Sequence, residues 1–164
     1  MNSKTFFALK VTDPYEDYHC IPNNMISNRD VSFVSAAAKV ASTSENRFKV
    51  GALIVKSGRV MGGSPNITRC SPRTPPNRFS THAEIAAINV ASDTDGSTMY
   101  IARLNSRNFY SMSRPCAWCM EKIIEAGVSR VVHTTDLFFG FQEQVAISSF
   151  YVDHVTWPKS LSIS

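Results

Sequence analysis

Four side chains in two short stretches of the sequence have the types and the spacing of a metal centre. His82 stands two positions before Glu84 in the stretch STHAEIAAI, just as an apolar helical pattern begins. Cys116 stands three positions before Cys119 in the stretch SRPCAWCMEKI, also at the expected start of a helix. Two cysteines three positions apart can face one point, and the positive end of a helix favours their metal-ligating thiolate forms.

Three of these residues suit a catalytic zinc site. Two cysteines leave a tetrahedral zinc ion short of ligands, and His82 can supply a third, which leaves one position open for water. An open position is typical of catalytic zinc and not of structural zinc. Zinc brings the pKa of its bound water close to neutrality, and the carboxylate of Glu84 can then take a proton from that water and return it.

The same residues allow other interpretations. A single histidine at a helix start is more often a cap or a surface residue than a ligand. Cys116 and Cys119 can also form a redox pair, although nothing else in the chain resembles a thioredoxin. Cys70 would make the site structural if it supplied a fourth ligand from its proline-rich loop. The occurrence of both motifs in this order, with a strand between them, favours the catalytic site.

The composition predicts an intracellular, globular protein. The chain has 164 residues, of which 43% are hydrophobic and 18% charged, which is enough to bury a core. No apolar run approaches the ~20 residues that cross a bilayer, and the N-terminal stretch lacks the apolar region of a signal peptide. We therefore expect a cytoplasmic protein with no membrane partner. The net charge of +4 and the pI near 9.0 are compatible with a phosphate-bearing partner.

Helical and strand patterns alternate along the chain. After an irregular segment over 1–27, a helix is predicted through 31–43, with Asn28 or Asp30 as its cap. The other predicted elements are strands over 48–55, 59–63, 97–104, 129–135 and 152–157, and helices over 81–91, from Pro115 to Gly127, and over 140–151, with a loop over 64–79. This alternation predicts an α/β fold, a three-layer α/β/α sandwich around a mixed sheet of roughly five strands. We expect one domain over 1–164, with the motifs in a core over 28–157.

The combination of H-x-E and P-C-x-x-C matches the signature of zinc-dependent nucleobase deaminases, and the chain resembles the cytidine and deoxycytidylate deaminase superfamily. The resemblance runs from about 30 to 135 and includes KVGALIV, HAEIAAI, TMYIA, PCAWC and GVSRVVHT. It implies a cytidine-deaminase-like fold, Zn²⁺ held by His82, Cys116 and Cys119, and Glu84 as the proton carrier. Histidine at position 82 points to nucleotide or polynucleotide members, since nucleoside deaminases usually have cysteine there. The preferred reaction is hydrolytic deamination of dCMP to dUMP with release of ammonia.

The resemblance also implies contacts to a small nucleotide substrate. Asn66 takes the place of an asparagine that binds the ribose or the base, and the backbone amide of Ala83 takes the place of one that orients the base. Arginines near the motifs are candidates for phosphate recognition, because a guanidinium fork matches phosphate oxygens. These candidates are Arg69, Arg73 and Arg78 in the loop over 67–80, and Arg114 before the Pro-Cys motif. The chain departs from the family at Ser64-Pro65-Asn66 and in a long connection over 105–114.

Two alternative functions remain open on the sequence. One is deamination within a polynucleotide, of cytosine in single-stranded DNA or RNA or of adenosine in tRNA. Aromatic residues at 138, 139 and 141 suit stacking on single strands, although packing of the next helix explains them better. The other is a zinc-stabilised nucleic-acid-binding module, against which Glu84 argues because a structural site needs no such carboxylate. Relatives commonly form dimers or larger rings, so we expect a homo-oligomer.

Overall fold

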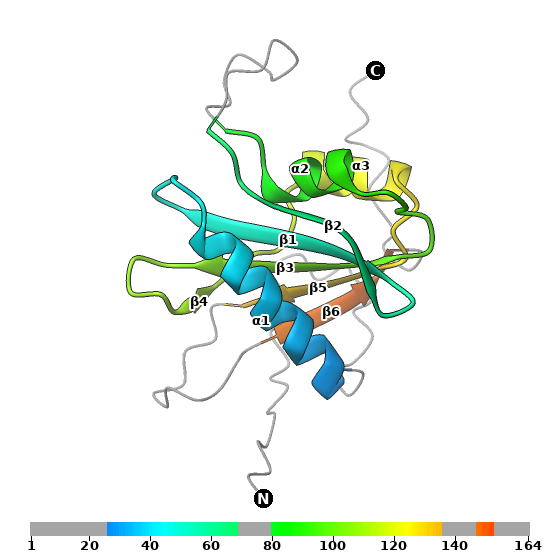
Figure 1. Ribbon diagram of the computed structural model, residues 1–164, viewed down its shortest axis with the longest axis horizontal. Coiled ribbons are helices and arrows are strands. Elements are labelled where there is room, and N and C mark those ends of the chain that lie inside the picture. The colour runs from blue at the N-terminus through cyan, green and yellow to red at the C-terminus, as the bar shows by residue number, and fades with distance from the viewer. Residues whose placement is uncertain (1–25, 69–79, 136–146, 153–164) are drawn as a thin grey trace, which may run out of the picture.

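A mixed sheet with helices on both of its faces forms the centre of the molecule (Figure 1). A computed structural model describes residues 26–68, 80–135 and 147–152, without the side chains of residues 148 and 150. The elements are α1 (Asn28–Ser42), β1 (Lys49–Lys56), β2 (Arg59–Pro65), α2 (Ala83–Val90), β3 (Thr98–Leu104), β4 (Tyr110–Ser111), α3 (Ala117–Glu125), β5 (Arg130–Thr134) and β6 (Ile147–Tyr151).

The strands lie in the order β2-β1-β3-β5-β6, and the two-residue β4 pairs with β3. Strands β3 and β5 run parallel, as the crossover through α3 requires, and the other pairs are antiparallel. Ser57 and Gly58 join β1 to β2 with positive φ angles of 51° and 76°, the backbone that a two-residue hairpin turn needs. The predicted mixed sheet is confirmed, with five strands along its main path and β4 beside them.

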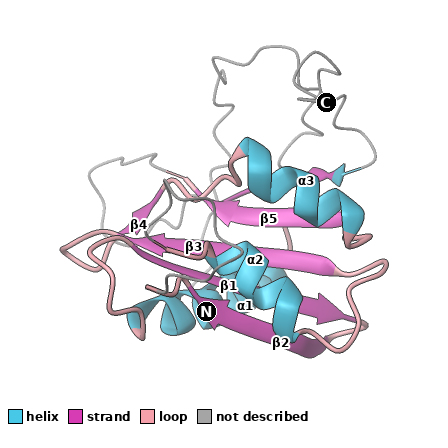
Figure 2. Cartoon of the chain, turned by 90° about the horizontal axis from the view of Figure 1, so that it is seen from above, coloured by secondary structure: helices cyan, strands magenta, loops and turns pink. Residues whose placement is uncertain are grey.

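Alternate residues of β1 enter two different cores, one on each face of the sheet. Ala52 and Ile54 pack with residues of α2 and α3, whereas Leu53 and Val55 pack with residues of α1. Figure 2 shows α2 and α3 together in front of the sheet and α1 behind it. The predicted three-layer α/β/α sandwich is therefore confirmed. Because successive side chains of a strand point to opposite faces, a central strand between two helical layers must be apolar on both.

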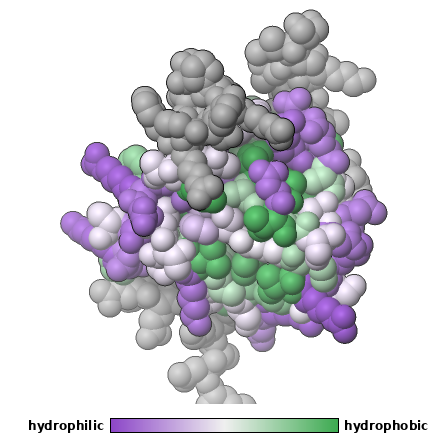
Figure 3. All heavy atoms as spheres, turned by 45° about the horizontal axis from the view of Figure 1, so that its top comes forward, coloured by the Kyte–Doolittle hydropathy of each residue, from purple (hydrophilic) through white to green (hydrophobic). Residues whose placement is uncertain are grey.

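The outer surface of the α2 and α3 layer is partly apolar. Figure 3 turns this side forward and shows apolar side chains towards the middle of the face, with polar side chains at its edges. Val90 of α2 and Ile124 of α3 are among the exposed apolar residues. Within the described ranges, no helix has both the length and the apolar character needed to cross a membrane.

The N-cap of helix α1 lies before both residues that were predicted to cap it. Ser27 is the N-cap, and its hydroxyl oxygen accepts a hydrogen bond from the backbone N of Asp30 at 3.1 Å. The carboxylate of Asp30 in turn accepts one from the backbone N of Ser27 at 2.9 Å. This reciprocal pair is a capping box, so Asp30 belongs to the first turn of the helix and does not precede it.

The prediction of a helix over 140–151 is wrong in the part that the structure describes. Residues 147–151 form strand β6, which pairs antiparallel with β5 along its whole length. A short run with isoleucine and aromatic residues is compatible with a helix or a strand. It forms a strand because the open edge of β5 supplies backbone hydrogen-bond partners. The predicted strand over 152–157 and the aromatic residues at 138, 139 and 141 lie outside the described residues, except for Val152.

Smaller corrections concern the ends of elements around the motifs. Strand β2 continues through Pro65, two residues beyond the predicted end, and the predicted loop lies outside the described residues from 69 to 79. Pro115 precedes the N-cap of α3 and does not open its first turn. Gly127 does end that helix, with a φ angle of 76° and with the N–H of Val128 bonded back to the carbonyl of Ile123, as in a Schellman motif.

Candidate active site

The N-terminal ends of α2 and α3 lie together and carry the motif residues. His82 is the N-cap of α2 and Cys116 is the N-cap of α3, both in extended backbone conformations. Cys119 lies in the first turn of α3 and is fully buried. The Nδ1 atom of His82 is 3.2 Å from Sγ of Cys119 and 3.6 Å from Sγ of Cys116. Two helix starts from separate parts of the chain therefore bring three ligand-type atoms together.

These three residues fit a zinc ion by their geometry and by their chemistry. One ligand atom from each of His82, Cys116 and Cys119 lies within 4.8 Å of the others. An imidazole nitrogen and two thiolates are donors that zinc prefers, and three protein ligands leave a fourth position for water or substrate. A hydrogen bond with Cys119, aided by His82, lowers the pKa of the Cys116 thiol to about 3, which favours the thiolate that binds metal.

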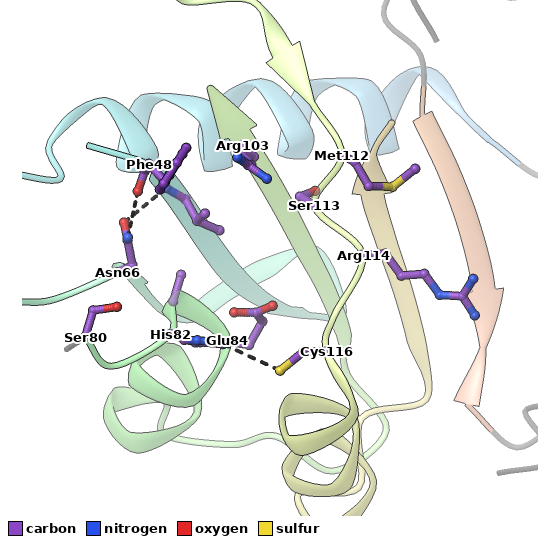
Figure 4. Close-up of a pocket in the computed structure, with 12 residues that line it drawn as sticks. Phe48, Asn66, Ser80, His82, Glu84, Arg103, Met112, Ser113, Arg114 and Cys116 are labelled. Atoms are coloured by element: carbon purple, nitrogen blue, oxygen red, sulfur yellow. Dashed lines mark hydrogen bonds between the residues drawn. The ribbon is translucent and has the colours of Figure 1, made fainter. Parts of the chain in front are cut away.

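Glu84 is buried beside this cluster. It stands in the first turn of α2 with only 5% of its surface exposed, and Figure 4 shows its carboxylate between the strands and the start of α3, near His82 and Cys116. Burial raises the pKa of Glu84, which the neighbouring charge of His82 counteracts. A carboxylate with a raised pKa holds and releases a proton closer to neutral pH, as a general acid and base must.

A pocket of about 450 Å³ opens next to the cluster, a size that accepts a small ligand. It draws its lining from the starts of α2 and α3 and from the ends of strands. Figure 4 shows these residues, which are Phe48, Val50, Asn66, Ser80, His82, Ala83, Glu84, Arg103, Met112, Ser113, Arg114 and Cys116. Three predicted substrate contacts, Asn66, Ala83 and Arg114, thus lie in the lining. The other three, Arg69, Arg73 and Arg78, lie outside the described residues.

Asn66 lines the pocket while its side chain also anchors the stretch over 44–50. Its Oδ1 atom accepts hydrogen bonds from the hydroxyl of Ser44 at 2.7 Å and from the backbone N of Val50 at 3.0 Å. Its Nδ2 atom donates one to the carbonyl of Phe48 at 2.7 Å. The second hydrogen on Nδ2 is the donor that Asn66 can offer to a ligand.

Arg114 contributes less to the metal end of the pocket than its place in the sequence suggests. Its side chain is half-buried, and burial lowers the pKa of its guanidinium. Figure 4 shows the guanidinium pointing away from Glu84 and Cys116, towards strand β6. The position beside the Pro-Cys motif fixes the backbone of Arg114 at the pocket, but it does not fix the direction of the side chain.

Sequence reasoning missed several lining residues, among them Phe48, Arg103 and Ser113. Ser113 positions the segment that leads to Cys116, because its hydroxyl donates to the carbonyl of Ile101 at 3.0 Å and accepts from the backbone N of Thr134 at 3.0 Å. The sequence does hold a sign that Arg103 is functional, because it is the charged residue in a predicted strand whose other residues are uncharged. This sign does not show which pocket the side chain reaches.

The comparisons with known proteins agree with this geometry. The family model described as the cytidine and deoxycytidylate deaminase zinc-binding region matches residues 27–135. That region contains His82, Glu84, Cys116 and Cys119. The expected zinc cofactor is confirmed, and His82, Cys116 and Cys119 are grouped so that they could hold the ion. No curated protein matches the chain.

Solved structures of similar fold include two of the dCMP deaminase of the cyanophage S-TIM5. The apo form is 26% identical, covers 69% of this chain and 87% of that chain, and has a TM-score of 0.52. The complex with dCMP and dUMP is 25% identical, covers 68% and 85%, and has a TM-score of 0.53. A cytidine deaminase from Burkholderia pseudomallei, 21% identical over 76% of this chain and 93% of that chain with a TM-score of 0.52, shares the fold.

Proposed function

Because the chain belongs to the cytidine and deoxycytidylate deaminase family, we propose that it catalyses the hydrolytic deamination of a cytosine nucleotide, from dCMP to dUMP with release of ammonia. The observation that carries the proposal is the buried carboxylate of Glu84 beside His82, Cys116 and Cys119, at the wall of a pocket of about 450 Å³. A purely structural zinc site has no use for a buried carboxylate, whose desolvation is unfavourable.

The residues of the site have separate roles in the proposed hydrolysis. His82, Cys116 and Cys119 hold the zinc ion, which when bound supplies a water of near-neutral pKa. Glu84 takes a proton from the attacking water and passes protons to the base, so that the amino group at C4 leaves as ammonia while a carbonyl oxygen takes its place. The backbone amide of Ala83, buried in the pocket wall, orients the base.

A nucleotide is favoured over a nucleoside as the substrate by two features. The dCMP deaminase of S-TIM5, which has a similar fold, was solved in complex with dCMP and dUMP. Two arginines, Arg103 and Arg114, line the pocket, and a phosphate is the anionic group of a nucleotide that guanidinium recognises. Asn66 is the proposed contact to the sugar or base. Arg69, Arg73 and Arg78 remain proposed phosphate contacts.

The test is a substrate panel with the zinc-loaded full chain. Ammonia release is measured on dCMP, CMP, dCTP, deoxycytidine, single-stranded DNA and tRNA, with Glu84→Ala as the inactive control. The proposal expects dCMP as the best substrate and no release by the variant. If the wild-type chain, at full zinc occupancy, releases ammonia from none of them, it is not a deaminase of these substrates. Release from DNA or tRNA alone would replace the mononucleotide with a polynucleotide substrate.

A further inference from the structure

The pocket contains a cationic side chain that the zinc motifs do not explain. Arg103, at the end of β3, lines the pocket, and its guanidinium carbon lies 4.9 Å from the centre of the Phe48 ring. The ion pairs of the described residues join other side chains and leave Arg103 without a carboxylate partner. Within this part of the chain, the aromatic face of Phe48 stabilises its charge, and no carboxylate competes with an anion that enters the pocket.

The backbone around Arg103 holds it in a defined place. In the sheet its Cα is paired with that of Val50 in β1 and with that of Ser111 in β4. Its backbone N donates a hydrogen bond to the hydroxyl of Thr134 at 3.2 Å. A side chain on a strand with neighbours on both sides has a fixed origin, so the direction of its guanidinium is set by its own rotamer and by its neighbours, among them Phe48.

The contact with Phe48 leaves the hydrogen-bonding edge of the guanidinium usable. An arginine that stacks on an aromatic ring contributes its face, whereas its N–H groups point outward in the plane and can bind two phosphate oxygens. Phe48 is 56% exposed, which places this pair at the mouth of the pocket. The guanidinium carbon of Arg47 lies 5.6 Å from the centre of the same ring and adds positive charge there.

Arg103 lies across the pocket from the metal cluster. Figure 4 shows Arg103 and Phe48 on one side of the pocket and His82, Glu84 and Cys116 on the other. A base that reacts beside Glu84 must direct its sugar and phosphate away from the cluster, towards the mouth. Arg114, whose guanidinium points towards β6, is oriented less well for that phosphate.

We infer that Arg103 is the residue that selects a substrate carrying a 5′-phosphate, with Phe48 as the residue that positions its guanidinium. The inference rests on the proposed deamination of a cytosine nucleotide and adds the group that distinguishes a nucleotide from a nucleoside. It also predicts that the two residues act on substrate preference and not on the zinc chemistry.

The experiment compares dCMP with deoxycytidine on the zinc-loaded full chain and its variants. In Arg103→Ala, kcat/KM for dCMP should fall about 10–100-fold, mainly through KM, because a charge-assisted bidentate contact is lost. The value for deoxycytidine should stay unchanged. Arg103→Lys should lie between, since it keeps the charge without the planar fork, and Phe48→Leu should raise KM for dCMP by a smaller factor. The matched control is Arg107→Ala, which removes an exposed arginine of the neighbouring turn and should change neither substrate.

Several outcomes would overturn the inference while leaving deamination intact. One is an equal loss on dCMP and deoxycytidine in Arg103→Ala, which would mark a structural role. Others are a wild-type chain that prefers deoxycytidine, or one that acts only on an oligonucleotide. If no compound is deaminated at all, the affinities of dCMP and deoxycytidine are compared by calorimetry. Tighter binding of dCMP that is lost in Arg103→Ala would support the inference, and equal affinities for the two compounds would overturn it.

Discussion

Asp30 and Glu84 are the two carboxylates buried among the described residues, and both stand in the first turn of a helix. Asp30 is surrounded by donors. It accepts hydrogen bonds from the hydroxyl of Tyr100 at 2.7 Å and from two guanidinium nitrogens of Arg130 at 2.9 Å and 3.1 Å. Burial acts to raise the pKa of Asp30, but these bonds and the one from the backbone of Ser27 outweigh it and hold the pKa below its usual range.

Glu84 has a similar exposure and the opposite balance. Its pKa is raised because burial outweighs the bonds and charges around it, which come from its own amide, His82 and Cys119. Both carboxylates lie near the positive end of a helix, which favours their charged forms. The difference between them therefore comes from their partners. Burial alone therefore does not mark a functional carboxylate, whereas burial with few compensating donors beside a pocket does.

The largest expected effect is the loss of activity when Glu84, the carboxylate with few donors, is neutralised. Glu84→Gln keeps the size of the side chain but cannot transfer a proton, so kcat/KM should fall by about 10²–10⁴-fold. The zinc content should remain at the wild-type level, and the variant should not be less stable, because an unfavourable buried charge has been removed. Ammonia release, metal analysis and urea unfolding measure the three quantities. Activity close to that of wild type would refute the role of Glu84 as proton carrier.

Neutralising Asp30, the carboxylate with many donors, should lower stability and leave activity unchanged. Asp30→Asn leaves the guanidinium of Arg130 buried without its counter-charge, so the free energy of unfolding should drop by about 3–5 kcal/mol. The folded, zinc-loaded variant should keep the kcat of wild type. Since the pKa of Asp30 is lowered on folding, its contribution is present above the usual pKa and is lost as the pH falls through the lower value of the folded protein.

The matched control for Asp30 is another aspartate, which stands in an exposed ion pair. Asp93 pairs with Lys56 at 2.6 Å, with side-chain exposures of 47% and 34%. Asp93→Asn should leave the urea midpoint unchanged, because solvent screens exposed pairs. Equal effects of Asp30→Asn and Asp93→Asn would mean that the cluster around Asp30 adds no more to stability than a surface contact.

His133 extends the comparison to a buried base on β5. Burial lowers the pKa of His133 to about 4, with the charge of Arg114 acting in the same direction. Between pH 6.5, the ordinary pKa of histidine, and pH 4, His133 binds a proton in the unfolded chain but not in the folded chain. The free energy of unfolding should therefore decrease as the pH falls from 6.5 to 4. The loss is on the order of 3 kcal/mol. His133→Gln should flatten this part of the profile in urea unfolding at each pH. Zinc release on acidification affects both proteins, so the difference between their profiles is the quantity to read.

The part of the site that depends on short-range pattern was predictable, and the part that depends on strand pairing was not. The two motifs place His82, Glu84 and the cysteines at helix starts, because capping and helical periodicity act over a few residues. Arg103 enters the pocket because β3 pairs with β1 in a register that sets it opposite Val50. The bond between Asp30 and Arg130 joins residues 100 positions apart. No local pattern encodes either juxtaposition.

The fold shows the same division. The layers follow from apolar strands that alternate with helices, and they were predicted correctly. The prediction of a helix at strand β6 fails because the free edge of β5 supplies a tertiary partner that overrides a weak local preference. The arginines of the loop over 67–80 were predicted from their charge and from their place beside the motif, and they lie outside the described residues. Within the described part of the pocket, the guanidinium of Arg103 lies 4.9 Å from the centre of the Phe48 ring.

The smallest expected effect separates the cap of α1 from the ion pair that Asp30 makes. Ser27→Ala removes the hydroxyl that accepts from the backbone N of Asp30, yet the backbone N of residue 27 can still donate to the Asp30 carboxylate, as it does in wild type. The free energy of unfolding should therefore drop by about 1 kcal/mol, the usual value for a cap, and Asp30 should keep its lowered pKa.

Combining the two substitutions decides whether the cap and the ion pair are one unit. In a double-mutant cycle by urea unfolding, Ser27→Ala should have a smaller effect in the Asp30→Asn background, because both residues belong to the same capping box. If Ser27→Ala alone destabilised as much as Asp30→Asn, the cap and not Arg130 would hold the buried carboxylate in place. The contrast with Glu84 would then rest on the helix start and no longer on the donors around it.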